Sequence, residues 1–212
     1  MFNQISNNDF AEIVKGRRSV RHYDENVKIS REEIGEMISE ASLAPSSANM
    51  QPWRVVVADT PEGKEKLRPL VRFNTAQNDT SSAMLLIFGD TQCYLYAEEI
   101  YNAAVEQGNM PAEVRDRQLG TILSMYPTLP QELKVEVAKI DSSLFAMQFM
   151  LVARAHGYDT NPMAGFETDQ VAQAFGLDEE RYAPVMMISI GKAKEEGHES
   201  VRLSADKITF WR

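Results

Sequence analysis

The sequence predicts an α+β fold in which helices cover a sheet of few strands. A few segments have the short, β-branched, apolar character of buried strands, while several longer segments repeat apolar residues at helical spacing. Long connections separate the strand candidates, which disfavours a sandwich or a pure helix bundle. The chain has 212 residues and no linker rich in Pro, Gly or Ser, no repeat and no low-complexity segment. We therefore expect residues 1–212 to form a single domain.

Polar cap residues predict where the first two helices begin. Asn8 or Asp9 can cap a helix that ends near Gly16, because either side chain accepts hydrogen bonds from free first-turn amides. Ser30 and Glu33 form a capping box ahead of apolar residues at helical spacing, and the next proline must end this second helix.

The remaining elements follow from apolar runs and the breakers beside them. Strands are expected at residues 53–58, 83–88 and 184–190, and helices from residue 61 and at about 92–107, 111–125, 131–156 and 168–175. Segment 142–155 is apolar almost all round, so we expect it to lie in the core or in a seam between subunits. Alternating polarity over 202–211 predicts a terminal strand whose aromatic residues must dock onto something, for instance another subunit.

Composition excludes several classes of protein. The 31 acidic residues outnumber the 22 Lys and Arg and give a net charge of -9, which argues against a nucleic-acid binder. The lone cysteine, Cys93, cannot form an internal disulfide, so we expect a reducing compartment, the cytoplasm. The first ten residues lack the pattern of a signal peptide, and no apolar stretch approaches the ~18 residues of a membrane span, so we expect no membrane partner.

Several catalytic motifs do not occur. The sequence contains no GxGxxG, no GxxxxGK and no GxSxG. Its three histidines are far apart and one cysteine adds no cluster, so we expect no metal site. If the protein is an enzyme, a cofactor is expected to carry the chemistry.

Four cations and a hydroxyl group lie within the seven residues 15–21. Such a run is compatible with a solvated basic loop. It is also suited to gripping a phosphate or the edge of a flavin, because arginine matches phosphate oxygens and each charge-assisted bond contributes roughly 1.5 to 3 kcal/mol. The groups available for this role are Arg17, Arg18, Ser19 and Arg21.

Two further turns are candidates for the same site. Residues 44–53, with the sequence Ala-Pro-Ser-Ser-Ala-Asn-Met-Gln-Pro-Trp, form a polar loop that could equally be an ordinary connection. Residues 161–166, Asn-Pro-Met-Ala-Gly-Phe, follow the long buried helix. There Gly165 could let a planar ligand approach a backbone amide, or could simply serve a turn.

Together these motifs resemble the FMN-dependent nitroreductase family. The pattern comprises Arg-Arg-Ser-x-Arg, Pro-Ser-Ser-x-Asn-x-Gln-Pro-Trp, Asn-Pro-Met-x-Gly-Phe and a final Ser-Val-Arg, in order from about Phe10 to Arg202. The resemblance implies a mostly antiparallel sheet covered by helices and an interlocked homodimer. It also implies that a carboxy-terminal tail, about residues 195–212, packs on the partner subunit.

The resemblance assigns the basic residues to the phosphate and the flavin ring. It implies that Arg17 and Ser19 bind the FMN phosphate, that Arg21 lies near flavin N1 and O2, and that Arg202 completes the phosphate clamp. Arg18 stands where the family often has histidine.

The polar loops are implied to hold the flavin ring from both subunits. The residues expected to reach it from the partner chain are Pro45, Ser46, Ser47 and Asn49. Asn74 and Gln77 are expected on its pyrimidine side. Near N5 the resemblance places Ala164 and Gly165, and it counts Pro162 and Met163 among the residues that bind the cofactor.

Three positions depart from the family pattern. Gln77 replaces a lysine, Ala164 replaces a glutamate beside N5, and Ser200 replaces a lysine two residues before the terminal arginine. The Gly165 amide could still point at N5.

The implied activity is two-electron transfer by a ping-pong mechanism. Hydride would pass from NADH or NADPH to FMN, and a flat acceptor such as a nitroaromatic or quinone would then be reduced in the same place, with lid residues expected around 94–125. No side chain is expected to be catalytic, although Arg21 would tune the flavin. The alternatives are a specialised flavin enzyme that dehalogenates, dehydrogenates or cleaves flavin, and a non-catalytic flavin-binding redox sensor.

Overall fold

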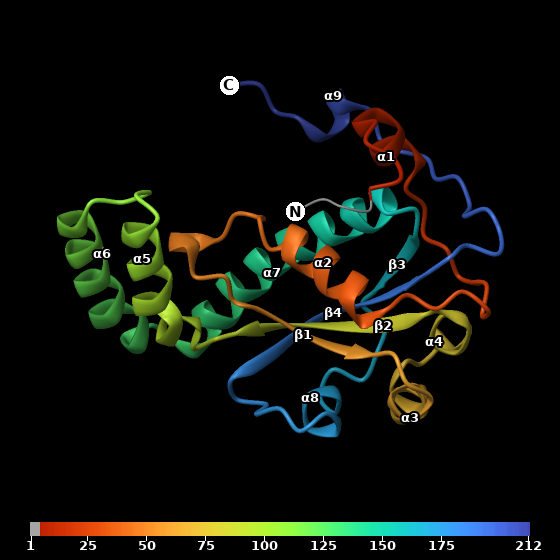
Figure 1. Cartoon of the computed structure of the whole chain (residues 1–212), viewed down its shortest axis with the longest axis horizontal. Coiled ribbons are helices and arrows are strands. Elements are labelled where there is room, and N and C mark those ends of the chain that lie inside the picture. The colour runs from red at the N-terminus through yellow and green to blue at the C-terminus, as the bar shows by residue number, and fades with distance from the viewer. Residues whose placement is uncertain (1–4) are drawn as a thin grey trace.

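The computed structural model describes residues 5–212, which form a four-stranded sheet with helices on both faces (Figure 1). The strands are β1 (Trp53–Ala58), β2 (Ala83–Asp90), β3 (Asp159–Met163) and β4 (Tyr182–Gly191). Their order is β1-β2-β4-β3, and every neighbouring pair is antiparallel. The prediction of a helix-covered, antiparallel α+β sheet is confirmed.

Most of the helices lie where the sequence predicted them, and α4 and α9 are additional. They are α1 (Phe10–Gly16), α2 (Arg31–Ala41), α3 (Pro61–Leu67), α4 (Thr75–Thr80), α5 (Ala97–Glu106), α6 (Ala112–Met125), α7 (Gln131–Ala155), α8 (Val171–Ala174) and α9 (Ala205–Ile208). The predicted caps are confirmed, because Asp9 accepts from the amide of Glu12 and Ser30 accepts from that of Glu33.

Strand β2 lies between two apolar cores and is buried along its whole length. On one face Leu85 and Ile87 pack in a cluster with residues of α2 and α7, including Phe145. On the other face Leu86 and Phe88 pack with residues from α3, α8 and the segment after β3. A strand buried on both sides explains why this segment lacks polar alternation.

Helix α7 is the longest helix and approaches the sheet very closely at Gly89. A Cβ atom there would lie 2.9 Å from the Cβ of Ala138 and 3.0 Å from its carbonyl oxygen, so a side chain at this position would push the helix away. On its outer side α7 exposes Ile140, Leu144 and Met147, by 56%, 44% and 43%. The helix is therefore half core and half exposed apolar surface.

Several details of the elements differ from the expectations. Strand β3 and helices α4 and α9 were not predicted, because a proline in β3 and polar residues in α4 hide their character. The helix expected at 168–175 shortens to α8, and the one expected from residue 92 begins with a 3-10 turn at Cys93–Tyr96. No helix of the described residues is long and apolar enough to cross a membrane.

The prediction of a terminal strand is wrong. The tail forms only the short helix α9 and then continues without strand pairing (Figure 1). Ile208, Phe210 and Trp211 are 64%, 81% and 88% exposed, so the alternating polarity reflects apolar residues that this chain does not itself bury.

Candidate functional site

The basic segment after α1 lies beside β3. Ser19 forms a parallel bridge with Thr160, and the amide of Val20 donates to the Thr160 carbonyl at 3.1 Å. Because β3 ends with Pro162 and Met163 and leads directly into Ala164 and Gly165, the first and third sequence motifs meet at this edge of the sheet.

Three guanidinium groups gather next to this edge. Burial lowers the pKa of Arg17, and the charges of Arg202 and Arg18 lower it further. Among residues 5–212 none of these three arginines forms an ion pair with a carboxylate. Grouped positive charge without a carboxylate is suited to an anionic ligand.

The three arginines are not equivalent. The Arg18 side chain turns back onto α1, where it donates to the carbonyls of Lys15 and Arg17, while Arg202 donates to Ser200 and to the Val201 carbonyl. Arg21 is exposed, and no side-chain hydrogen bond of Arg21 is found within the described part of the chain.

The turn after β3 meets the loop that precedes α4. The Asn74 amide donates to the carbonyls of Gly165 at 3.0 Å and Val71 at 3.1 Å, and Gln77 donates to the Asn74 side-chain oxygen at 3.2 Å. The structure thus brings together Asn74, Gln77 and Gly165. Ala164 and Gly165 are exposed, whereas the Met163 side chain is in the core, so only backbone atoms of Met163 could face a ligand.

The loop between α2 and β1 has an unusual backbone. Ala48, Asn49 and Gln51 adopt left-handed φ angles of 51°, 57° and 46°. Such conformations cost non-glycine residues roughly 1 to 3 kcal/mol each and cluster at functional sites. Ser46 helps to hold the loop by accepting from the Gln51 amide at 3.0 Å.

Side chains of α7 and α5 hold this loop in place. The Ser47 amide and hydroxyl donate to Asp141 of α7 at 2.9 and 3.2 Å, and the Tyr101 hydroxyl donates to the Ala48 carbonyl at 3.0 Å. Pro45 and Asn49 are exposed at its surface. Sequence reasoning missed the role of Asp141 in holding this loop. The available signal was an acidic residue at the start of an otherwise apolar stretch of α7.

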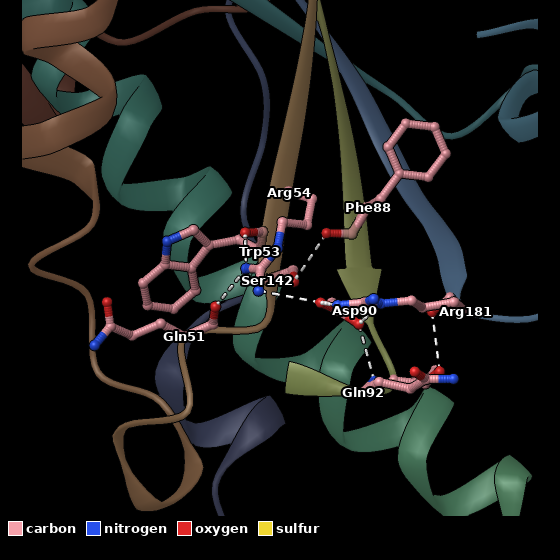
Figure 2. A network of polar contacts seen from close by, with 9 residues as sticks. Gln51, Trp53, Arg54, Phe88, Asp90, Gln92, Ser142 and Arg181 are labelled. Atoms are coloured by element: carbon pink, nitrogen blue, oxygen red, sulfur yellow. Dashed lines mark hydrogen bonds and ion pairs between the residues drawn. The ribbon is translucent and has the colours of Figure 1, made fainter. Parts of the chain in front are cut away.

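A buried carboxylate connects the same loop to the sheet (Figure 2). Asp90 is fully buried at the end of β2, and both its oxygens accept from Arg181 at 2.8 Å. Arg54 of β1 approaches it at 3.1 Å and also donates to the Gln51 carbonyl at 2.9 Å. The hydrogen bonds that Arg181 donates to the Asp90 carboxylate raise the pKa of Arg181. Sequence reasoning missed this network, although an acid ending an apolar strand was a signal.

An apolar cavity of about 320 Å³ lies behind Ser47, between the loop and α7. It is lined by Met50, Pro52, Cys93, Met125, Tyr126, Leu129, Leu133, Val137 and Ala138, with Asp90 and Asp141 among its polar groups. Burial raises the pKa of the Cys93 thiol to about 11, so the cavity wall holds no reactive thiolate at neutral pH.

The candidate residues form two separate groups in one chain. The loop at 45–51 lies on the side of α5, whereas α1, β3 and α4 lie toward the other end of the sheet (Figure 1). No hydrogen bond or ion pair among residues 5–212 joins this loop to Arg17, Asn74, Gly165 or Arg202. The site geometry is therefore divided between two regions of the surface.

The chain belongs to the nitroreductase family, whose sequence model, "Nitroreductase family", matches residues 14–192. A protein from Exiguobacterium sibiricum, whose crystal structure was solved in complex with FMN, is 54% identical. Their alignment covers 99% of this chain and 100% of that one, with a TM-score of 0.95.

Two further relatives are similar over nearly their whole length. The Bacillus subtilis protein named "Putative NAD(P)H nitroreductase YdgI" is 54% identical over 98% of this chain and 100% of its own. The "CLA biosynthesis enone reductase" of Lactiplantibacillus plantarum is 46% identical over 97% of this chain and 95% of its own.

Proposed function

We propose that this protein is an FMN-dependent NAD(P)H oxidoreductase that acts as a homodimer and reduces flat acceptors, such as nitroaromatics and quinones, by a ping-pong mechanism. The carrying observation is the group of arginines without carboxylate partners at the sheet edge that leads to Gly165. Family membership and the similarity to the FMN-bound protein support the choice of cofactor. We place the protein in the cytoplasm because of its lone cysteine.

The residues present fit FMN in charge and in donor type. Arg17, Ser19 and Arg202 would hold the phosphate, and Asn74 and Gln77 would meet the polar edge of the ring. When bound, FMN would supply the redox chemistry by accepting hydride from NADH or NADPH and delivering it to the acceptor.

Arg21 is the residue proposed to tune this chemistry. A cation about 4 Å from a developing negative charge contributes about 4 kcal/mol at an effective dielectric near 20. Its exposed guanidinium has no competing carboxylate among residues 5–212, so it is available for that role.

The divided site supports a dimer. The loop at Pro45, Ser46, Ser47 and Asn49 would reach the flavin held by the Arg17 and Gly165 region of the other chain. The exposed apolar stripe of α7 and the exposed aromatic tail supply surfaces for such an interface, since apolar patches of this kind mark contact sites.

A second acceptor class is favoured by one comparison. The enone reductase relative is 46% identical, so an α,β-unsaturated ketone belongs in the set of acceptors to be tested. The apolar cavity behind Ser47 would accommodate a hydrocarbon portion of such an acceptor.

The proposal is tested by loading purified protein with FMN and measuring turnover with NADH and NADPH. The acceptors are a nitroaromatic, menadione and an α,β-unsaturated ketone. We expect a yellow protein, stabilised by about 2.7 kcal/mol when FMN is at 100 times its dissociation constant. Flavin binding without turnover would instead favour the redox sensor, and a cleaved flavin or a dehalogenated product would favour a specialised enzyme.

A matched pair of variants tests the assignment of Arg21. Arg21→Ala should slow flavin reduction in stopped-flow measurements. The control is Arg31→Ala, which removes an arginine of α2 that pairs with Asp59 and should leave the rate of flavin reduction unchanged. Equal rates for both variants would remove Arg21 from the site.

A further inference from the structure

The turn before α4 contains two residues in energetically unfavourable states, Arg72 and Phe73. Arg72 has a left-handed φ of 50°, which is rare for a non-glycine residue outside constrained sites. The next residue, Phe73, is 97% exposed and so gains nothing from burial. Something else must hold this turn in its shape.

A bidentate ion pair holds it. Arg72 donates to both oxygens of Glu167, from Nε to Oε1 at 2.7 Å and from Nη2 to Oε2 at 3.0 Å. The Glu167 amide in turn donates to the Leu70 carbonyl at 2.9 Å. The fork geometry fixes direction as well as distance, because two parallel hydrogen bonds allow little rotation.

The pair lies next to the contact between the two motif turns. Asn74 is two residues beyond Arg72 and donates to the carbonyl of Gly165, which is two residues before Glu167. Leu70 and Phe166 are buried in the same core cluster and anchor both turns from below. Two contacts therefore join the same two turns: the Arg72–Glu167 ion pair and the hydrogen bond from Asn74 to Gly165.

We propose that Arg72 and Glu167 are positioning residues that lock the Asn74 turn against the Gly165 turn and so pre-shape the polar edge that receives the flavin. This inference rests on the proposed function. An exposed ion pair adds little to overall stability. Loss of this ion pair should therefore reduce the local order of the two turns and the affinity for FMN, and should change the free energy of unfolding of the whole chain much less.

Two substitutions at one position separate the lock from backbone strain. Arg72→Ala removes the ion pair and leaves a side chain that disfavours a positive φ, so the turn should relax. Arg72→Gly removes the same pair but accepts the positive φ without strain. We expect the FMN dissociation constant to rise about tenfold in Arg72→Ala and by a smaller factor in Arg72→Gly.

The matched control is Arg31→Ala. Arg31 forms a similar exposed, bidentate pair with Asp59, at 2.5 and 3.0 Å, on a different part of the fold. Its loss should leave the FMN dissociation constant and the visible spectrum of the bound flavin unchanged.

Hydrogen exchange of the FMN-free protein supplies a readout that does not depend on the cofactor. The amides of Asn74 and Glu167 donate to the carbonyls of Val71 and Leu70, both at 2.9 Å. Both amides should exchange several-fold faster in Arg72→Ala than in the unmodified chain or in Arg31→Ala.

The outcomes are distinguishable. Unchanged amide exchange and unchanged FMN affinity in Arg72→Ala would overturn the lock while leaving the proposed function intact. Faster exchange with unchanged affinity would overturn its role in flavin binding. An unmodified chain that binds no FMN would overturn the proposed function, and the positioning role with it.

Discussion

The Asp141 carboxylate accepts two hydrogen bonds from Ser47, one from the backbone amide at 2.9 Å and one from the hydroxyl at 3.2 Å. The carboxylate is 3% exposed and comes from α7, whereas Ser47 belongs to the strained loop between α2 and β1. The helix that exposes the apolar stripe is thus the same helix that fixes the loop proposed to reach a second chain's flavin.

Asp141→Ala should destabilise the chain and weaken FMN binding. It leaves the partly buried Ser47 amide without an acceptor, which costs about 1 to 3 kcal/mol of unfolding free energy. Urea unfolding and FMN titration measure the two effects. Asp141→Asn keeps an oxygen acceptor and should cost less, and an Asn variant as weak as the Ala variant would contradict this account.

Asp90→Ala should be among the most damaging single changes. Removing one partner from a buried charge network typically costs 3–5 kcal/mol, because Arg181 and Arg54 would lose their counter-ion. Asp59→Ala, which breaks the exposed pair with Arg31, should cost at most about 1 kcal/mol. Similar losses for both variants in urea unfolding would refute the distinction.

The stability of the chain should rise with pH through Lys64. Burial, and then the charge of Lys28, lower the pKa of Lys64 from 10.5 to about 8. Between these values the unfolded amine is protonated and the folded one is not, so the unfolded state binds more protons and unfolding becomes less favourable as pH increases.

A methionine substitution isolates this effect. Lys64→Met should be more stable than the unmodified chain at pH 7, and this advantage should shrink by pH 10. Lys66→Met, at an exposed neighbouring position, should show no such convergence. A constant difference between Lys64→Met and the unmodified chain across this range would show that Lys64 titrates normally.

The carboxy-terminal aromatics are expected to stabilise the dimer. Phe210 and Trp211 are 81% and 88% exposed in one chain, and their double substitution by alanine should shift the monomer–dimer equilibrium toward monomer. Sedimentation velocity at several concentrations measures this shift. Lys66→Ala, an exposed residue of α3 outside both the tail and the apolar stripe of α7, serves as the control, and an equal effect would contradict a specific role for the aromatics.

Local signals predicted most of the fold. Caps at Asp9 and Ser30 and the apolar run of β2 determine their elements through short-range physics, so their predicted positions hold in the structure. Strand β3 escaped prediction because its identity comes from pairing with β4, which no local pattern in Asp-Thr-Asn-Pro-Met reveals.

The candidate site was predictable in its motifs but not in its supports. Asn74 and Gly165 are recognisable by type and spacing, and the structure brings them into contact. Asp141 and Glu167 support the motif residues from distant parts of the chain, and only the tertiary fold reveals such pairings.

The absence of a side chain at Gly89 has a consequence beyond local packing. A rod-like helix pressed outward at one point tilts as a unit, so any side chain larger than hydrogen at that point would swing the far end of α7. In the proposed homodimer that movement would misalign both cofactor sites at once, although neither contains Gly89. We expect this glycine to tolerate no substitution, and the reason is mechanical leverage acting across the two subunits.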